Sequence, residues 1–375
     1  MAMLSSAQLV SNELSSASAD LTDDRVSDQH PALRYADDTE LDAEWLSAQL
    51  GAAVGCSHRI ARHLASGGMG HVFVAEHDYL GALAAVKVPR YADATGRNIL
   101  EAEARLLAKL EHPNIVRAMD VGQLADGRMY LMMEHVAGIE LGAWLDAHGP
   151  MPFERALTVL AQVASALDYL HRKGIVHGDI KPANLLIDVS ANDFVKLLDF
   201  GIASNTGSKE RRGAFGTPEY MAPEQARGEA WGTACDVYAL AALAIQLLTG
   251  HALHEHRSAQ DVLTAVLSDP APAPSALGLN VPGLDAVFAK GLHREPAQRY
   301  PRASAFVSAL AETLRAPARA KPSEPVAVSA ATEHRGPSAV SRRLASPWGL
   351  VLNDRVLRKL AAGVFAAVYI FSVYG

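Results

Sequence analysis

The segment His177-Gly178-Asp179-Ile180-Lys181-Pro182-Ala183-Asn184, followed after two apolar runs by Leu198-Asp199-Phe200-Gly201, carries the residues that decide the fold. The apolar runs between the two motifs would form the strands of a hairpin, which brings the polar side chains to one edge. Asp199 and Asn184 offer the hard oxygen ligands that Mg²⁺ takes. Lys181 can neutralise a phosphoryl group in transfer, and Asp179 is free to orient a hydroxyl and accept its proton. The pattern indicates phosphoryl transfer to an alcohol.

These motifs resemble the eukaryotic-type (Hanks-type) serine/threonine protein kinase family, most of all its bacterial members. Further family motifs follow in the family's order across roughly residues 57–314, among them His112-Pro113-Asn114-Ile115-Val116 and Gly216-Thr217-Pro218-Glu219-Tyr220-Met221-Ala222-Pro223-Glu224. The resemblance implies an α+β, bilobal protein kinase-like fold. Its N-lobe (57–134) would hold an antiparallel sheet plus one helix, and its C-lobe (135–314) would be mainly helical.

The resemblance also implies the roles of the site residues. ATP would be the phosphoryl donor, Mg²⁺ would be held by Asn184 and Asp199, and the catalytic residues would be Asp179, Lys181 and Asn184. The predicted reaction is transfer of the γ-phosphoryl group of MgATP to protein Ser or Thr hydroxyls. Lys181, two residues after Asp179, resembles the serine/threonine branch of the family.

A nucleotide site is implied near the start of the domain. Residues 65–70, Ala-Ser-Gly-Gly-Met-Gly, are similar to the family's phosphate-covering loop, with Ala65 where the first glycine is usual. Lys87 would hold the α- and β-phosphates through an ion pair with Glu103, which motif register favours over the competing Glu101. The expected nucleotide contacts are Leu64, Ala65, Ser66, Gly67, Gly68, Met69, Gly70, His71, Val72, Ala85, Lys87, Glu103, Met133, Glu134 and Val136.

One position departs from the family pattern. Gly178 replaces the arginine that ordinarily precedes the catalytic aspartate and pairs with a phosphate on the activation segment. Thr206 and Ser208 are the candidate phosphoacceptors of that segment, and the missing arginine puts activation by their phosphorylation in doubt. A later family motif implies a buried ion pair between Glu224 and Arg299.

The N-terminal region differs in composition from the rest. Residues 1–56 hold ten acidic against two basic residues, a net charge of −8 in a chain whose total is −7. Such a composition, with little apolar periodicity, predicts a largely disordered arm. Within it, residues 39–50 have helical apolar spacing, and this short helix either docks on the kinase core or stays nascent.

The C-terminal region is predicted to tether the domain. Residues 315–347 are a Pro/Ala-rich linker, and residues 348–375 begin basic and end in the uncharged run 360–375. As a helix this run would be roughly 24 Å long, somewhat short of the roughly 30 Å core of a bilayer. We expect a C-terminal membrane anchor with the kinase domain in the cytoplasm. The alternative is a tail that packs on the protein or makes a dimer.

Two other functions fit parts of the pattern. One alternative is a pseudokinase scaffold, which Ala65 and Gly178 suggest. The other is a small-molecule kinase of the same broad fold. It is disfavoured because Gly216–Glu224 resembles a protein-substrate platform that such enzymes lack. The expected partners are a protein substrate and, for autophosphorylation, a second copy of the chain. No basic stripe indicates nucleic acid. Cys56 and Cys235 have no disulfide or metal spacing, so a reducing interior is expected.

Overall fold

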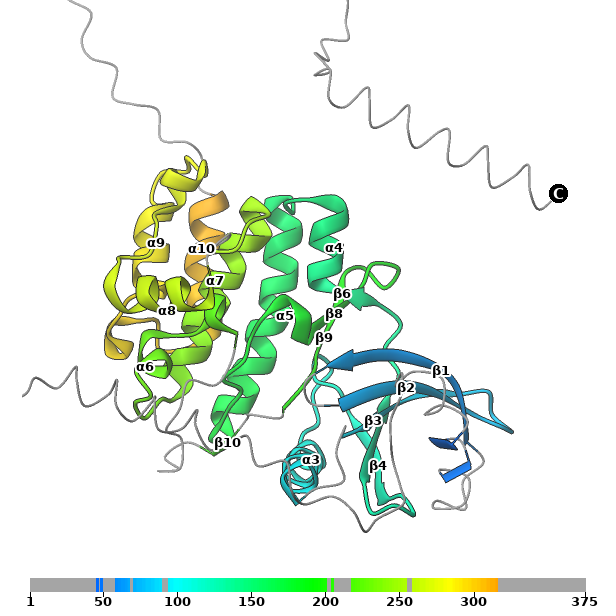
Figure 1. The fold of residues 1–375 in the computed structure, drawn as a ribbon. Coiled ribbons are helices and arrows are strands. Elements are labelled where there is room, and N and C mark those ends of the chain that lie inside the picture. The colour runs from blue at the N-terminus through cyan, green and yellow to red at the C-terminus, as the bar shows by residue number, and fades with distance from the viewer. Residues whose placement is uncertain are drawn as a thin grey trace, which may run out of the picture. The chain divides into compact units, whose positions relative to one another are not determined.

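The computed structural model describes residues 45–46, 48–49, 58–67, 70–89, 94–200, 204–205, 217–254 and 258–315 (Figure 1). All of these belong to one structural unit, Met1–Arg319. Most of the acidic arm, the predicted linker and anchor, and the candidate phosphoacceptors Thr206 and Ser208 lie outside the described residues. Among the helices that are described, none is long and apolar enough to cross a membrane.

The N-lobe is a five-stranded antiparallel sheet with one packed helix, α3 (Ala94–Leu107), as predicted (Figure 1). In the spatial order β1-β2-β3-β5-β4, the strands are β1 (His58–Gly67), β2 (Gly70–His77), β3 (Leu83–Val88), β5 (Met129–Glu134) and β4 (Ala118–Gln123). The residues bounding β1 and β2 confirm that the glycine-rich stretch connects two paired strands, because Gly67 is the register partner of Gly70.

Alternation along the strands gives this sheet two different faces. Val72 and Ala85 lie on the face that lines a deep cleft. Phe73 and Val86, one residue further along each strand, lie on the opposite face in a buried apolar cluster that also contains Leu46. The described residues around Leu46 are helical, and Leu46 itself is only 2% exposed. The helix predicted over residues 39–50 is described only at residues 45–46 and 48–49, and there Leu46 packs on the sheet.

The C-lobe is built around α7 (Thr233–Thr249), of whose seventeen residues thirteen are buried (Figure 1). A helix that is apolar on all sides is expected to lie inside a protein. Three helices contact it: α5 (Phe153–Arg172), α9 (Leu284–Gly291) and α10 (Ala303–Arg315). The other described helices of this lobe are α4 (Leu141–His148), α6 (Pro223–Ala226) and α8 (Ala259–Ser268).

A small hairpin sets the position of the site, as predicted. Its strands β8 (Leu185–Asp188) and β9 (Phe194–Leu197) pair antiparallel, and β6 (Ile139–Glu140) adds a third strand. The turn residue Asp193 has a φ of 58°, a left-handed conformation that Asp tolerates better than most residues. Its carboxylate accepts two hydrogen bonds from Arg155 of α5, at 2.7 and 2.6 Å, which fixes the hairpin to the C-lobe.

The ion pair expected between Glu224 and Arg299 is present. Both residues are almost fully buried, and two N–H···O contacts of 2.7 Å join the guanidinium to the carboxylate. The remaining three guanidinium N–H groups donate to the carbonyls of His293, Ala234 and Arg294. Since all five donors are satisfied, the buried charge is fully compensated in the folded state.

Replacing Arg299 with Ala should lower the free energy of unfolding by about 3–5 kcal/mol, because the Glu224 carboxylate would be left buried and unpaired. The matched control is Arg315→Ala, which removes an equally short ion pair with Glu154 at a site where both side chains are exposed. Equilibrium urea denaturation should show a large loss for Arg299→Ala and nearly none for Arg315→Ala. Similar losses in the two variants would contradict this assignment.

Candidate active site

The loop that follows β7 (Ile175–Val176) is held by hydrogen bonds to Asp236, which lies in the first turn of α7. The backbone N–H groups of His177 and Gly178 donate to its carboxylate at 3.0 and 2.7 Å, and His171 Nε2 lies 2.7 Å from it. Burial alone would raise the pKa of Asp236, but the hydrogen bond and charge of His171, followed by His177 and the Gly178 N–H, outweigh burial and lower the pKa. The carboxylate is thus held ionised inside the protein.

The predicted catalytic residues lie together on this loop. Asn184 Nδ2 donates to Asp179 Oδ2 at 3.0 Å and to the Asp179 carbonyl at 2.8 Å. Lys181 Nζ lies 2.8 Å from Asp179 Oδ2 and donates to Thr217 Oγ1 at 2.8 Å. The Thr217 N–H donates to the other oxygen, Asp179 Oδ1, at 3.2 Å. A carboxylate, an ammonium and a hydroxyl therefore converge on one point.

A second charged cluster forms around Lys87. Its Nζ lies 3.0 and 2.8 Å from the two carboxylate oxygens of Glu103 and 2.9 Å from Asp199 Oδ1. Burial alone would lower the pKa of Lys87, but the carboxylates of Glu103 and Asp199 outweigh it and raise the pKa. The competing residue, Glu101, instead pairs with Arg105 at the exposed surface of α3. The predicted Lys87–Glu103 ion pair is therefore present.

Asp199 reaches Lys87 through an unusual backbone conformation. Its φ is 55°, in the left-handed region that non-glycine residues rarely adopt. The next N–H, of Phe200, donates to Glu103 Oε1 at 3.2 Å, and the Phe200 ring is buried. Strained backbone of this kind persists where surrounding contacts enforce it, and it is concentrated at functional sites.

A cleft of about 660 Å³ is lined by Lys87, Glu103 and Asp199 of the second cluster and by Asn184 of the first. Most of the predicted nucleotide contacts line it: Leu64, Ala65, Ser66, Gly70, Val72, Ala85, Lys87, Glu103, Met133, Glu134 and Val136. The predicted metal ligands Asn184 and Asp199 line it as well. Gly68 and Met69 lie outside the described residues.

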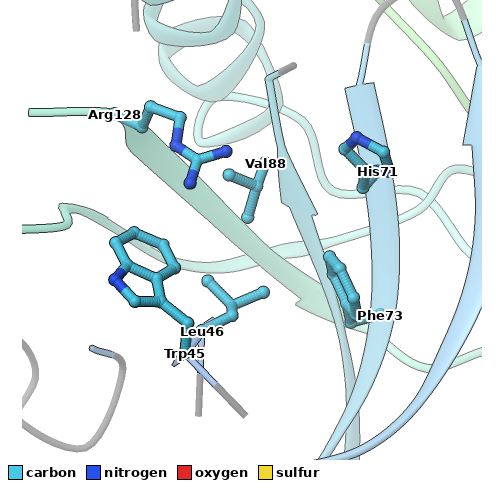
Figure 2. A pocket seen from close by; sticks show the side chains of 6 residues that line it. All are labelled: Trp45, Leu46, His71, Phe73, Val88 and Arg128. Atoms are coloured by element: carbon cyan, nitrogen blue, oxygen red, sulfur yellow. The ribbon is translucent and has the colours of Figure 1, made fainter. Parts of the chain in front are cut away.

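The prediction for His71 needs correction. Its side chain lies on the opposite face of the sheet, beside Trp45, Leu46 and Phe73 (Figure 2). The physical reason is the alternation of β2, which places residues 71 and 73 on one face and Val72 on the other. The His71 side chain therefore does not line the nucleotide cleft.

The lining residues that were not predicted include the larger apolar residues Val116, Leu186 and Leu198. Leu186 could have been predicted from the alternation of side chains along β8. Its neighbours in β8, Leu185 and Ile187, are buried in the C-lobe core, so alternation turns Leu186 towards the cleft. Val116 and Leu198 come from segments without regular secondary structure, where no such periodicity exists.

Comparison with known proteins agrees with this geometry. The family model for the protein kinase domain matches residues 58–289. The chain belongs to the protein kinase family. This confirms the resemblance on which the predicted α+β bilobal fold was based.

The relatives of this kinase include several bacterial serine/threonine-protein kinases. It is 38% identical to PknD of Mycobacterium tuberculosis over 274 residues, which cover 71% of this chain and 41% of PknD. It is 37% identical to PknH of Mycobacterium bovis over 277 residues, covering 72% and 46% of the two chains. For pkn3 of Myxococcus xanthus the identity is 34% over 276 residues, covering 70% and 50%. The chain thus spans half or less of the length of these relatives.

The side-chain oxygens of Asn184 and Asp199 are suitable ligands for a hard divalent cation. The Asn184 amide nitrogen is turned to Asp179, which leaves the amide oxygen on the other side, and the Asp199 side chain is 30% exposed. Mg²⁺ is commonly held by one or two protein oxygens together with phosphates and water. Among the described residues no three His, Cys, Asp or Glu side chains gather into a metal cluster, and a site of this sparse kind requires none.

Ala65, which replaces the usual glycine, causes no backbone strain. It is paired with Val72 in the β1–β2 ladder, and the described non-glycine residues with positive φ are Asn192, Asp193 and Asp199. An ordinary strand conformation accommodates a Cβ atom. The substitution therefore gives no structural reason for a collapsed cleft.

Gly178 is needed for a close contact as well as for its φ of +79°. A Cβ atom at this position would lie 2.3 Å from Cη2 of Trp231, which is buried. Gln225 Nε2 donates to the Gly178 carbonyl at 2.9 Å. Trp231 therefore occupies space that the first atoms of an arginine at position 178 would need.

Gly178→Ala should destabilise the kinase more than Gly149→Ala. Gly149 has a similar φ of +74°, with a ψ of −159°, but nothing within 4 Å of its missing Cβ, so its substitution should cost only the conformational term, about 1–3 kcal/mol. Gly178→Ala adds the clash with Trp231, so Gly178→Ala should cost less in a Trp231→Ala background than in the wild type. Urea denaturation of the wild type, the three single variants and the Gly178→Ala/Trp231→Ala double variant measures both effects. Equal costs at the two glycines would rule out the contact as a constraint.

Proposed function

We propose that this chain is a serine/threonine protein kinase that transfers the γ-phosphoryl group of MgATP to Ser or Thr hydroxyls of proteins, itself included. The observation that carries the proposal is the position of two charged clusters at one cleft. Lys87, Glu103 and Asp199 form one cluster and line the cleft. Asp179 and Lys181 belong to the other, whose Asn184 also lines the cleft. Membership of the protein kinase family supports the same activity.

The cleft suits a purine nucleotide. Val72 and Ala85 come from the N-lobe sheet and Leu186 from the C-lobe hairpin, so a flat ring would be enclosed from both lobes. Main-chain groups of Glu134 and Val136, next to the end of β5, would meet the edge of the ring. A volume of about 660 Å³ is within the range of small-molecule sites, roughly 300–1,000 Å³.

The charges then assign a role to each polar side chain. Lys87, oriented by Glu103, would bind the α- and β-phosphates. Mg²⁺, held by Asn184 and Asp199, would neutralise negative charge on the β- and γ-phosphates. The approach of an anionic triphosphate to this acidic site depends on that neutralisation, because Lys87 and Lys181 alone do not balance the carboxylates.

Asp179 is suited to receive the substrate. Its carboxylate is oriented by Asn184 and by the Thr217 N–H, which fixes where an incoming hydroxyl would be held. Asp179 would accept the hydroxyl proton as the substrate oxygen bonds to the γ-phosphorus and the bond to the ADP oxygen breaks. Lys181, 2.8 Å from both Asp179 and Thr217, would steady the γ-phosphoryl group during this exchange.

A scaffold without catalysis is the second candidate, favoured by the departures at Ala65 and Gly178. Neither departure removes a group from the two charged clusters. The two functions differ in whether labelled phosphate is transferred.

Incubation of the full chain with γ-labelled ATP, Mg²⁺ and a generic protein acceptor should label protein. Asp179→Asn should reduce the rate by a factor on the order of 10²–10⁴, because the proton acceptor is lost. Lys87→Met should also abolish transfer, with the larger loss of nucleotide affinity. Label incorporation by Asp179→Asn at the wild-type rate would refute the catalytic assignment.

A matched pair of glutamates on α3 provides the control. Glu103→Gln removes the buried partner of Lys87, whereas Glu101→Gln changes an exposed pair with Arg105. Only the first substitution should slow transfer. Wild-type protein that binds nucleotide but labels nothing would favour the scaffold.

Activity should not depend on phosphorylation of Thr206 or Ser208. Position 178 carries no side chain, and Trp231 lies where the first atoms of one would be, so a phosphate on the activation segment lacks its usual partner at position 178. The Thr206→Ala/Ser208→Ala variant, assayed by initial rates on a generic acceptor, should keep most of the wild-type rate. Inactivity of this variant, reversed by Asp at the same positions, would show that another cationic group receives the phosphate.

We also infer that residues 360–375, which carry no charge, tether the kinase to the inner face of the cell membrane. Basic residues Arg355, Arg358 and Lys359 precede this run, as expected for a segment whose N-terminal side stays in the cytoplasm. Self-association for autophosphorylation remains a prediction of the sequence. The protein substrate is defined only by chemical class, as a Ser or Thr hydroxyl.

A further inference from the structure

The N-lobe sheet has an apolar face directed away from the nucleotide cleft, which we call the outer face. It consists of Phe73, Ala75, Ala84, Val86, Val88, Leu124, Tyr130 and Met132. If an apolar patch of this kind were left uncovered on a soluble domain, it would ordinarily mark an interaction site. In this kinase the patch is covered by a segment that precedes the family-matched region, 58–289.

The covering segment, which we call the docking segment, comprises Trp45, Leu46, Ala48 and Gln49, all helical. Leu46 points into the outer face and is 2% exposed (Figure 2). Beside it the Trp45 ring lies under the Arg128 guanidinium, 4.9 Å from centroid to Cζ. Gln49 Oε1 accepts a hydrogen bond from the Ala125 N–H at 3.2 Å.

The fit between docking segment and sheet is close. The space left among Trp45, Leu46, Phe73, Val88 and Arg128 is about 10 Å³, enough for at most one water molecule. Arg128 is itself buried, and Asp126 holds its Nε at 2.7 Å. A desolvated guanidinium over an indole face gains more than an exposed one.

We propose that the outer face is a docking surface for a short helix bearing adjacent Trp and Leu residues, occupied by the chain's own docking segment, and that its occupation holds the phosphate-covering loop in its nucleotide-binding position. This inference rests on the proposed function for its nucleotide. Under this proposal, residues that precede the family-matched region contribute to nucleotide binding.

A chain of contacts links the docking surface to the loop. His71 borders the docking segment, and its Nδ1 lies 2.8 Å from Ser66 Oγ. Ser66 Oγ also lies 2.9 Å from His63 Nε2, and the His63 ring packs edge-on against Phe73 at 5.1 Å. Ser66 lines the nucleotide cleft from within the phosphate-covering loop. Packing against the outer face therefore determines the environment of a side chain at the nucleotide site.

A second route leads from the docking segment to α3. Gln49 and Trp45 contact the turn between β4 and β5, at Ala125 and Arg128. In the same turn the Gly127 carbonyl accepts a hydrogen bond from Arg97 of α3 at 3.2 Å. Because α3 also carries Glu103, the partner of Lys87, the turn connects the docking segment to the helix that orients the phosphate-binding lysine.

The test compares Leu46→Asp with Ala48→Asp in the full chain. Both add the same charge to the same segment, but Leu46 is buried and Ala48 is exposed. Leu46→Asp should lower the unfolding temperature and raise the Kd for a fluorescent ATP analogue about fivefold or more, as expected for coupled sites. Ala48→Asp should change neither. Equal effects of the two substitutions, or an unchanged Kd in Leu46→Asp, would overturn the proposal.

Addition in trans tests the surface itself. A peptide with the sequence of residues 36–52, added to the Leu46→Asp chain, should restore nucleotide affinity, and the same peptide with Asp at position 46 should not. Failure of the native peptide to restore binding would count against docking as the cause. If Leu46→Asp does not fold, Trp45→Ala removes the contact with Arg128 without burying a charge and should raise the Kd in the same direction.

The route through Ser66 is tested by a double-mutant cycle. Leu46→Asp should raise the Kd less in a Ser66→Ala background than in wild type, because the link is already cut. Strictly additive effects would refute this route. Failure of the proposed function is distinguishable, because wild-type protein would then bind no nucleotide, while unfolding temperatures would still report whether Leu46 docks.

Discussion

A fully buried carboxylate, Asp236, fixes the loop on which the chemistry depends. It accepts hydrogen bonds from two successive backbone N–H groups of the catalytic loop and pairs with His171 of α5. A buried carboxylate without such partners would be very costly, so these hydrogen bonds hold α7, α5 and the loop together. Trp231 and Gln225 hold Gly178 from the other side. The loop is thus positioned by contacts within the C-lobe. Position 178 carries no arginine that could pair with a phosphate on the activation segment.

Charge pairing also joins the two lobes. Lys87 belongs to the N-lobe sheet and Asp199 follows the C-lobe hairpin, yet they lie 2.9 Å apart. Glu103 contacts Lys87 and also receives the Phe200 N–H, so α3 is held both to the sheet and to the start of the activation segment. Movement of α3 away from the cleft would remove Glu103 and leave the buried Lys87 ammonium with only Asp199 of these two carboxylates, which weakens the charge compensation.

The docked N-terminal segment follows from the same packing logic as the rest of the domain. A sheet that is apolar on both faces is stable only if other segments pack on each face. Here the face that lines the cleft is directed towards the C-lobe, and Leu46 packs on the opposite face. The structural unit therefore begins before residue 58, where the family resemblance starts. A chain truncated at that point would expose Phe73, Val86 and Met132.

Much of the fold and site was predictable because its signals are local. The loop from His177 to Asn184, the β8–β9 hairpin and the glycine-rich turn depend on residue spacing and strand alternation over a few positions. The same alternation, applied strictly to β2, would have placed His71 on the outer face. Contacts between distant segments were decided only by tertiary structure: Leu46 against the sheet and Trp231 against Gly178. Local propensities determine which face of a segment is apolar, whereas packing of the whole chain determines which other segment covers that face.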